Sequence, residues 1–403
     1  MKLRIDASRL PRGFEFSALA CGLKKSGLDL GLIASDVPAT AACVFTTNLV
    51  KAAPVLVSQA HLRRSAQKMR AIIVNSGNAN CATGVPGLAA SRRTAALVAR
   101  TFRCKPEQIL VCSTGVIGLP LRVEHILRAV PNLATSRSTR PESFAQFTRA
   151  IMTTDTRPKS AAASCHIDGK RVRLLGCAKG AGMIHPRMAT MLAFVVTDAA
   201  ASPNVLRRAL RDAIGGTFNA ITVDGDTSTN DTLALLANGA SGARAIGSDN
   251  ADYREFLGAL ESVCRSLALQ IVADGEGAHR VVEIEVRGAP SERAADAVAR
   301  TIANSPLVKT ALAGADPNWG RILAAAGRSG VRFNPGHVEV RMVGILMCRN
   351  GRAHFFDERT AHRKLLAAHV PIVVNLRAGN STARIWTCDF TGDYVRINAS
   401  YRS

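Results

Sequence analysis

Short apolar runs alternate along the chain with longer segments whose apolar positions recur every three or four residues. The short runs are rich in Val and Ile and end in turn-forming residues, as buried strands do, while the longer spacing favours helices. The alternation predicts an α/β protein. Strands are expected at LGLIAS, AACVFTT, APVLVS, AIIVNSG, QILVCSTG, RLLGCAKG, MLAFVVTD and VVEIEV (residues 30–35, 41–47, 53–58, 71–77, 108–115, 173–180, 191–198 and 281–286).

Helical spacing is clearest in three segments, and a turn-like RGAPSER after the last of these strands offers a domain boundary. We therefore expect a first domain over residues 1–287 and a smaller α/β domain over residues 288–403, containing 295–314, 337–347 and 384–390. The three helical segments are 87–102, 202–218 and 251–272.

The composition fits a large globular protein. The 403 residues are 47% hydrophobic, enough for a sizeable core, and we find no apolar run of the roughly 18 residues that would span a bilayer. The ten cysteines are scattered without a CxxC pair, and the nine histidines show no ligand spacing. We expect buried thiols, no metal site and a cytoplasmic location.

The positive charge is unevenly distributed. Of the 52 basic and 30 acidic residues, 28 basic and 9 acidic ones lie in residues 1–189, and no acid occurs between Val37 and Pro106. A nucleic-acid-binding face is one interpretation. The other is a solvated basic surface, which we favour because only 4% of the residues are aromatic and the arginines fall on exposed helix positions.

Two glycine-containing polar loops follow predicted strands, NSGNANCATG at 75–84 and CSTGVIG at 112–118. Such loops expose backbone N–H groups that can bind an anion or an oxyanion. Ordinary strand-to-helix turns give the same pattern, and neither loop has the spacing of a nucleotide-binding loop.

Two acidic segments are further candidates. Asp224, Asp226 and Asp231 in TVDGDTSTND suggest calcium, but the loop lacks the closing Glu of a calcium site, so hydrogen-bonded turns are the better interpretation. Glu276 in ADGEGAHR lies between two glycines, which suits either a turn that presents it to a ligand or an exposed acid at a helix end.

The segment KGAGMIHPRMATMLAFVVTD, residues 179–198, is unusual because a glycine-rich loop with a proline runs into small residues and then directly into an apolar strand. Together with NSGNANCATG, STGVIG, MTTDT, VDGDTSTND, DGEGA, ADPNWGRI and the terminal YVRINASYRS, it resembles the ornithine acetyltransferases, which are the glutamate N-acetyltransferases of arginine biosynthesis. The eight motifs occur in the same order over nearly the full length.

This resemblance implies a layered α-β-β-α sandwich and a precursor that cuts itself at the Ala189–Thr190 bond. Thr190 would then be the nucleophile and its freed α-amino group the base, because that amine has a pKa of about 7.7–8.0 and is partly neutral at cellular pH. The acetyl group would pass from N-acetylornithine to Thr190 and then to glutamate. No cofactor is consumed in that scheme.

The resemblance also assigns roles to matching positions. Thr114 and Gly115 would stabilise the oxyanion, Lys179 would bind a substrate carboxylate and Glu276 an ammonium group. Whether Thr153 or Thr154 faces the pocket stays open, because neighbours on a strand point opposite ways. The implied substrate-contacting residues are Thr153, Lys179, Thr190, Glu276, Asn398 and Ser403.

The resemblance implies two copies of each cleaved segment in a heterotetramer, and it leaves acetyl-CoA open as a second acetyl donor. Two other functions are weighed against this one. A self-cleaving N-terminal-nucleophile aminopeptidase normally has Ser at the cut and has no need of Lys179 or the NASYRS tail. A noncatalytic basic protein that binds RNA would remain uncut.

Overall fold

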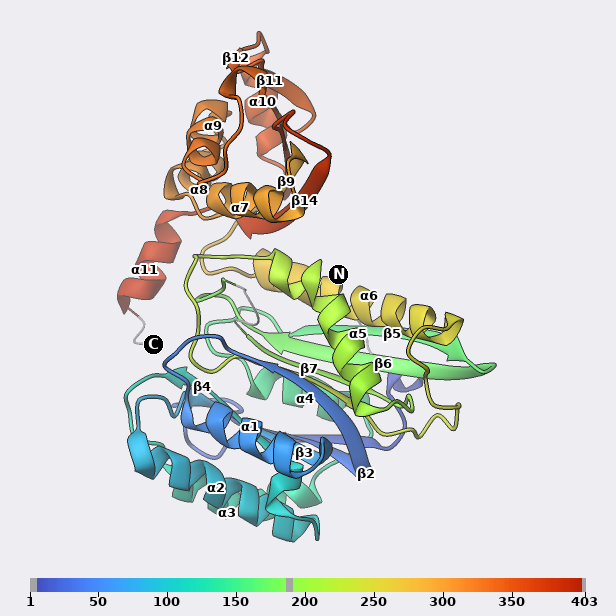
Figure 1. The fold of residues 1–403 in the computed structure, drawn as a ribbon. Coiled ribbons are helices and arrows are strands. Elements are labelled where there is room, and N and C mark those ends of the chain that lie inside the picture. The colour runs from blue at the N-terminus through green and yellow to red at the C-terminus, as the bar shows by residue number, and fades with distance from the viewer. Residues whose placement is uncertain (1–5, 186–190, 401–403) are drawn as a thin grey trace.

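The chain folds around two β-sheets, which are separated along the long axis of the molecule (Figure 1). The structure is a computed structural model, and it describes residues 6–185 and 191–400. The larger sheet has eight strands in the order β4-β3-β2-β8-β7-β6-β5, with β1 paired to β2. Its strands are β1 (Phe14–Leu19), β2 (Leu30–Phe45), β3 (Lys68–Asn78), β4 (Ile109–Val116), β5 (Lys159–Ile167), β6 (Lys170–Lys179), β7 (Leu192–Thr197) and β8 (Thr232–Ala237).

Strand β2 joins the two halves of this sheet. Its first half, from Leu30 to Ala34, pairs with β3, and its second half, from Thr40 to Phe45, pairs with β8. The register shifts between Ala34 and Ala39, and an irregularity of this kind bends a strand. LGLIAS and AACVFTT, predicted as two strands, are therefore the two ends of one.

The two halves face each other across an apolar core. Side chains of β3 and β4 meet those of β6, β7 and β8 there, and Phe16, Phe144, Phe147 and Phe194 fill the middle. The rings of Phe16 and Phe144 are 5.0 Å apart and those of Phe147 and Phe194 5.9 Å apart, both in the edge-to-face arrangement that aromatic rings prefer. The sheet is thus folded into the two inner layers of a sandwich.

Helices cover the outer faces of both halves (Figure 1). On one side α2 and α3 pack on β2, β3 and β4, and on the other α5 and α6 form one apolar cluster with β5, β6 and β7. The predicted α-β-β-α sandwich is confirmed. The helices of this part are α1 (Ala53–Arg64), α2 (Gly84–Thr101), α3 (Val123–Thr135), α4 (Pro141–Ala150), α5 (Pro203–Gly215) and α6 (Ala251–Ala273).

Helix α6 is the one described helix whose length and apolarity match a membrane span. It packs along β5 and β6 with Phe256, Leu260, Cys264 and Leu267 fully buried. Those contacts are typical of a core helix in a globular protein.

The smaller sheet has the order β12-β11-β10-β13-β9-β14. Strand β9 lies inside it, parallel to β13 and antiparallel to β14, whereas we expected VVEIEV to close the first domain at residue 287. The chain therefore passes from one sheet to the other before β9. The elements are β9 (Val281–Ala289), α7 (Glu292–Ala303), α8 (Pro306–Ala313), α9 (Trp319–Gly327), β10 (Glu339–Met342), β11 (Ile345–Arg349), β12 (Arg352–Ala353), α10 (Glu358–Leu365), β13 (His369–Asn375), β14 (Ser381–Cys388) and α11 (Gly392–Ser400).

One predicted strand is wrong. APVLVS begins helix α1, with Pro54 in the first turn, where a missing N–H costs nothing. Val55, Ser58 and His61, three residues apart, are buried along one face of the helix. The short apolar run is therefore the start of an amphipathic helix and not a strand.

Surface charge and cysteines agree with the composition. All ten cysteines are unpaired, with seven buried and three half-buried, as expected.

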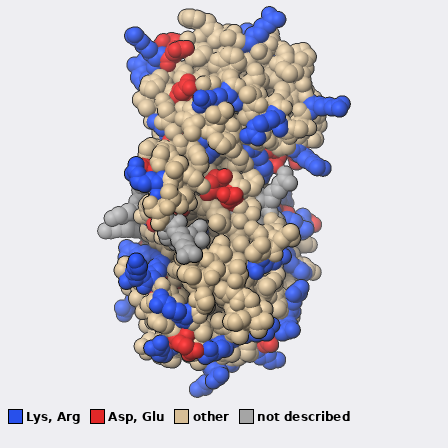
Figure 2. All heavy atoms as spheres, turned by 90° about the vertical axis from the view of Figure 1, so that its left-hand side faces the viewer, with Lys and Arg blue, Asp and Glu red and all other residues tan. Residues whose placement is uncertain are grey.

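Figure 2 shows Lys and Arg scattered over the face in view, with uncharged surface between them and no continuous basic stripe. That distribution is typical of a solvated surface.

Candidate functional site

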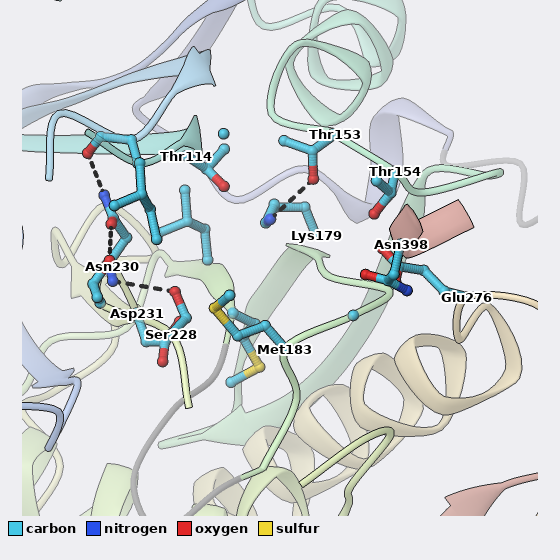
Figure 3. A pocket seen from close by; sticks show the side chains of 17 residues that line it. Thr114, Thr153, Thr154, Lys179, Met183, Ser228, Asn230, Asp231, Glu276 and Asn398 are labelled. Atoms are coloured by element: carbon cyan, nitrogen blue, oxygen red, sulfur yellow. Dashed lines mark hydrogen bonds between the residues drawn. The ribbon is translucent and has the colours of Figure 1, made fainter. Parts of the chain in front are cut away.

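A pocket opens where the loops at one end of the larger sheet meet the last helix (Figure 3). It gathers residues from eight separate parts of the chain, which the sequence spreads over more than 300 positions. The lining residues are Ala79, Thr114, Gly115, Ile117, Thr153, Thr154, Lys179, Gly182, Met183, Met191, Leu192, Ser228, Thr229, Asn230, Asp231, Glu276 and Asn398.

Thr114 and Gly115 form one wall at the end of β4. Gly115 has φ +129°, and a Cβ there would lie 2.4 Å from the carbonyl carbon of Gly77 in the neighbouring strand. No side chain fits at that position without moving the backbone. The end of β4 can therefore lie directly against the end of β3.

Buried amides fix the two polar loops to each other. Ser113 Oγ donates to Asn75 Oδ1 at 2.6 Å, and Asn230 Nδ2 donates to the carbonyl oxygens of Ala79 and Ser113 at 2.6 and 2.8 Å. Because these groups are buried, losing one partner would leave an unsatisfied polar atom. The loops thus have one defined arrangement behind Thr114.

Lys179, at the end of β6, faces the loop after α4. Its Nζ donates to Thr153 Oγ1 at 3.2 Å, the bond drawn in Figure 3. Both Thr153 and Thr154 line the pocket, and Thr153 is the one that holds the lysine. Removal of the ammonium group from bulk water lowers the pKa of Lys179, an effect that Asp155 and Asp231 oppose.

Glu276 and Asn398 meet on the opposite wall. Asn398 Nδ2, on α11, donates to Glu276 Oε2 at 2.8 Å, and the backbone N–H of Glu276 donates to Ala181 O at 2.9 Å. A Cβ on Gly182 would lie 2.4 Å from the same Oε2, so a larger residue there would displace this carboxylate. Glu276 is turned into the pocket, not out into solvent as an exposed helix-end acid.

Asp224 holds the chain before residue 186. Its carboxylate accepts the backbone N–H groups of Met183 and Ile184 at 2.5 and 2.9 Å, and Asp226 N–H at 3.2 Å. This is the hydrogen-bonded turn that we preferred to a calcium site. Burial raises the pKa of Asp224, although these backbone donors act against the rise.

Asp231 was missed as a pocket residue. Its side chain is only 2% exposed, and Oδ2 has no hydrogen-bond partner among the described residues. Burial raises the pKa of Asp231 well above its ordinary value. The signal available in the sequence was an acid two residues before the apolar run LALLA.

Six of the residues assigned from the resemblance, Thr114, Gly115, Thr153, Lys179, Glu276 and Asn398, thus line one pocket. The other assigned residues, Ala189, Thr190 and Ser403, lie outside the described residues.

The sequence matches the model of the ArgJ family over residues 15–403. The chain belongs to the ArgJ family. Its relatives within that family share its length as well as its sequence. The arginine biosynthesis bifunctional protein ArgJ of Thermotoga neapolitana is 44% identical over 398 residues, which cover 98% of this chain and all of that protein. The protein of the same name from Chlorobaculum tepidum is 48% identical over 399 residues, or 99% and 98% of the two chains.

A solved ArgJ structure is also similar. The arginine biosynthesis bifunctional protein ArgJ of Bacillus halodurans is 44% identical, with a TM-score of 0.50. The match covers 52% of this chain and 98% of the solved chain. The solved chain is therefore about half as long.

Proposed function

We propose that this protein moves an acetyl group from N-acetylornithine to glutamate, giving ornithine and N-acetylglutamate. The observation that carries the proposal is the single pocket in which Thr114, Lys179 and Glu276 converge from distant segments of the chain. Membership of the ArgJ family, whose relatives are named for arginine biosynthesis, supports the choice of reaction.

The proposed activating step is cleavage of the Ala189–Thr190 bond. Thr190 Oγ attacks the carbonyl carbon of Ala189, the acyl group shifts from nitrogen to oxygen, and water hydrolyses the resulting ester. This leaves a carboxylate on Ala189 and a free α-amine on Thr190. The half-length solved chain from Bacillus halodurans supports the step, since cleavage here would leave residues 190–403 as a segment of similar length.

The proposed transfer then has two halves. The α-amine of Thr190 takes the hydroxyl proton as Oγ attacks the acetyl carbonyl of N-acetylornithine, and ornithine leaves with a proton on its amine. The amine of glutamate next attacks the acetyl-threonine ester and regenerates the hydroxyl. Both halves pass through a tetrahedral oxyanion of the same acetyl group.

In this scheme Thr114 and Gly115 stabilise that oxyanion. The hydroxyl of Thr114 and a backbone N–H at Gly115 would donate to it, and removing one such donor typically lowers turnover about 10²- to 10³-fold. Their fixed arrangement supports this role, because preorganised donors need no rearrangement during the reaction.

Lys179 and Glu276 divide the recognition of substrate by charge. One N–H of the Lys179 ammonium group donates to Thr153, which leaves two N–H groups for the α-carboxylate that acetylornithine and glutamate share. Glu276, held by Asn398, is suited to the ammonium end of ornithine. Ser403 belongs to the same proposed set of substrate contacts.

Two further parts of the proposal concern partners. The relatives are named bifunctional proteins, which supports acetyl-CoA as a second acetyl donor for glutamate. Two copies of each cleaved segment would form the assembled enzyme.

The decisive experiment compares the wild type with Thr190→Ala. Denaturing electrophoresis should show two segments for the wild type and one 42.6 kDa band for the variant. The wild type should acetylate glutamate from N-acetylornithine, and the variant should not. A wild type that is active while uncut, or one that hydrolyses peptide amides and leaves glutamate unacetylated, contradicts the proposal.

A further inference from the structure

A buried lysine outside the pocket connects the segments that carry the pocket residues. Lys159 Nζ lies 2.5 Å from Asp155 Oδ1 and 2.5 Å from Asp274 Oδ2, and the three side chains are 1%, 0% and 2% exposed. Asp155 precedes Lys159 by four residues, whereas Asp274 is more than a hundred residues away, at the end of α6.

Asp155, held by Lys159, in turn fixes the backbone at two pocket residues. Its Oδ2 accepts the backbone N–H of Thr153 at 3.0 Å, and its Oδ1 accepts that of Gly180 at 2.7 Å. Thr153 and the residue before Gly180, Lys179, are the two partners in the hydrogen bond across the pocket. One carboxylate therefore sets both ends of that bond.

Asp274, also held by Lys159, fixes the backbone next to Glu276 on the opposite wall of the pocket. Its carboxylate accepts the backbone N–H of Thr156 at 3.1 Å and the hydroxyl of the same residue. Glu276 follows two residues later, through a tight turn in which Gly275 N–H donates to Val272 O at 3.1 Å. The ammonium group of Lys159 is thus the junction between the loop of Thr153, the end of β6 and the turn of Glu276.

We propose that Lys159 is a positioning residue, which holds Thr153, Lys179 and Glu276 at the separation that the substrate requires. The expected effect on substrate binding rests on the proposed function, but the contacts of Lys159 do not depend on it. An apolar side chain could fill the same space, since a buried ion triad adds little net stability, but it would not draw two carboxylates to one point. Burial raises the pKa of Asp155, yet Lys159 and Lys179 more than compensate and the pKa lies below its ordinary value, so the carboxylate stays charged.

The chain contains a matched control. Lys309, on α8, is also buried, at 3% exposure. Its Nζ donates to Thr387 Oγ1 at 2.8 Å and to the carbonyl oxygen of Cys388, and it lies 5.7 Å from the centre of the Phe390 ring. It does not line the pocket. Replacing either lysine removes a buried cation, but only Lys159 binds the two carboxylates that hold the pocket segments.

The test compares Lys159→Met with Lys309→Met in the processed enzyme. Amide hydrogen exchange should rise in the first variant at residues 152–156, 179–184 and 274–277 together, and in the second variant at neither 152–156 nor 179–184. The KM for N-acetylornithine, per folded molecule, should rise about tenfold or more in Lys159→Met with a smaller change in kcat, because misplaced binding groups weaken substrate binding. Lys159→Arg should recover part of that loss.

Thr156→Val covers the case in which Lys159→Met does not fold. The threonine is exposed, and its replacement removes one donor to Asp274 while leaving the ion pairs in place. Its KM should rise by a factor of about two to five. A wild-type KM in every folded variant at position 159 or 156, or unchanged exchange at the three segments, overturns the proposal. A wild type that transfers no acetyl group would instead overturn the proposed function, and the exchange result would still decide the role of Lys159.

Discussion

Charged side chains are treated differently at the pocket end of the larger sheet and on the exposed face of the smaller sheet. At the pocket end of the larger sheet, Lys159, Asp155 and Asp274 are removed from water and hydrogen-bonded to backbone. On the smaller sheet, Arg384 pairs with Glu283 and Glu285 at 3.0 and 3.4 Å, but the arginine side chain is 43% exposed. Solvent screens such surface pairs, so they add little to stability, whereas buried charges fix geometry at a cost. The comparison separates a part of the molecule built to hold a site from one built as a scaffold.

The largest expected effect comes from removing charge inside the pocket. Lys179→Met should lower kcat/KM for N-acetylornithine about 10²-fold or more, because the substrate carboxylate loses its charged partner. Steady-state kinetics on the processed protein measure this. Arg384→Met is the control on the other sheet, and equal losses in the two variants would end the distinction between the sheets.

The second largest effect is expected from crowding the backbone at Gly115. Gly115→Ala places a methyl group against Gly77, so we expect a loss of about 2–3 kcal/mol in the free energy of unfolding, together with loss of activity. Gly118→Ala, three residues on, is the matched control. It also has positive φ, +81°, but no heavy atom lies within 4 Å of its added Cβ, so only about 1 kcal/mol should be lost. Denaturant unfolding distinguishes the two, and similar losses would show that crowding at position 115 is relieved elsewhere.

The third effect depends on pH. Because the pKa of Asp231 is raised above 3.8, this residue contributes stability that is complete below pH 3.8 and is lost as pH rises through the raised pKa. Asp231→Asn removes that loss, so its melting temperature relative to the wild type should increase with pH. Each pH unit between the two pKa values corresponds to about 1.4 kcal/mol.

Thermal melts of both proteins from pH 4 to pH 9 make the measurement. Asp224, whose pKa is also raised, is present in both proteins and cancels in the difference. A constant difference between the two melting curves across this range would mean that Asp231 is ionised at its ordinary pKa.

The smallest effect is expected on the scaffold sheet. Arg384→Met should change the free energy of unfolding by less than about 1 kcal/mol, and the change should shrink at high salt, because the ion pairs are exposed. Urea titrations at low and high salt test both statements. A loss of several kcal/mol would show that the scaffold depends on its surface charges as the pocket does on its buried ones.

The sequence allowed much of the fold to be predicted. Strongly periodic or β-branched segments, such as AIIVNSG and residues 251–272, have the expected structure because local preference and burial agree there. TLALLA, which forms β8, was overlooked since Leu and Ala favour helices and only the neighbouring strands make it one. Helix α3 was overlooked as well, and it contains Pro131.

The site divides in the same manner. Thr114, Lys179 and Glu276 could be named because motifs of the family surround them. The bond between Lys159 and Asp274 could not, because nothing local in the sequence relates two residues so far apart, and only the packing of α6 along β5 brings them together. Contacts made by tertiary structure alone are the part that a single sequence leaves open.

Helix α11 leaves the scaffold sheet after β14 and reaches back so that Asn398 touches Glu276 (Figure 1). A purification tag or fluorescent fusion appended after residue 403 would therefore begin only a few residues from the pocket. Labels for assays on this protein are better attached near the exposed Phe355, which follows β12 at the far end of the smaller sheet (Figure 1).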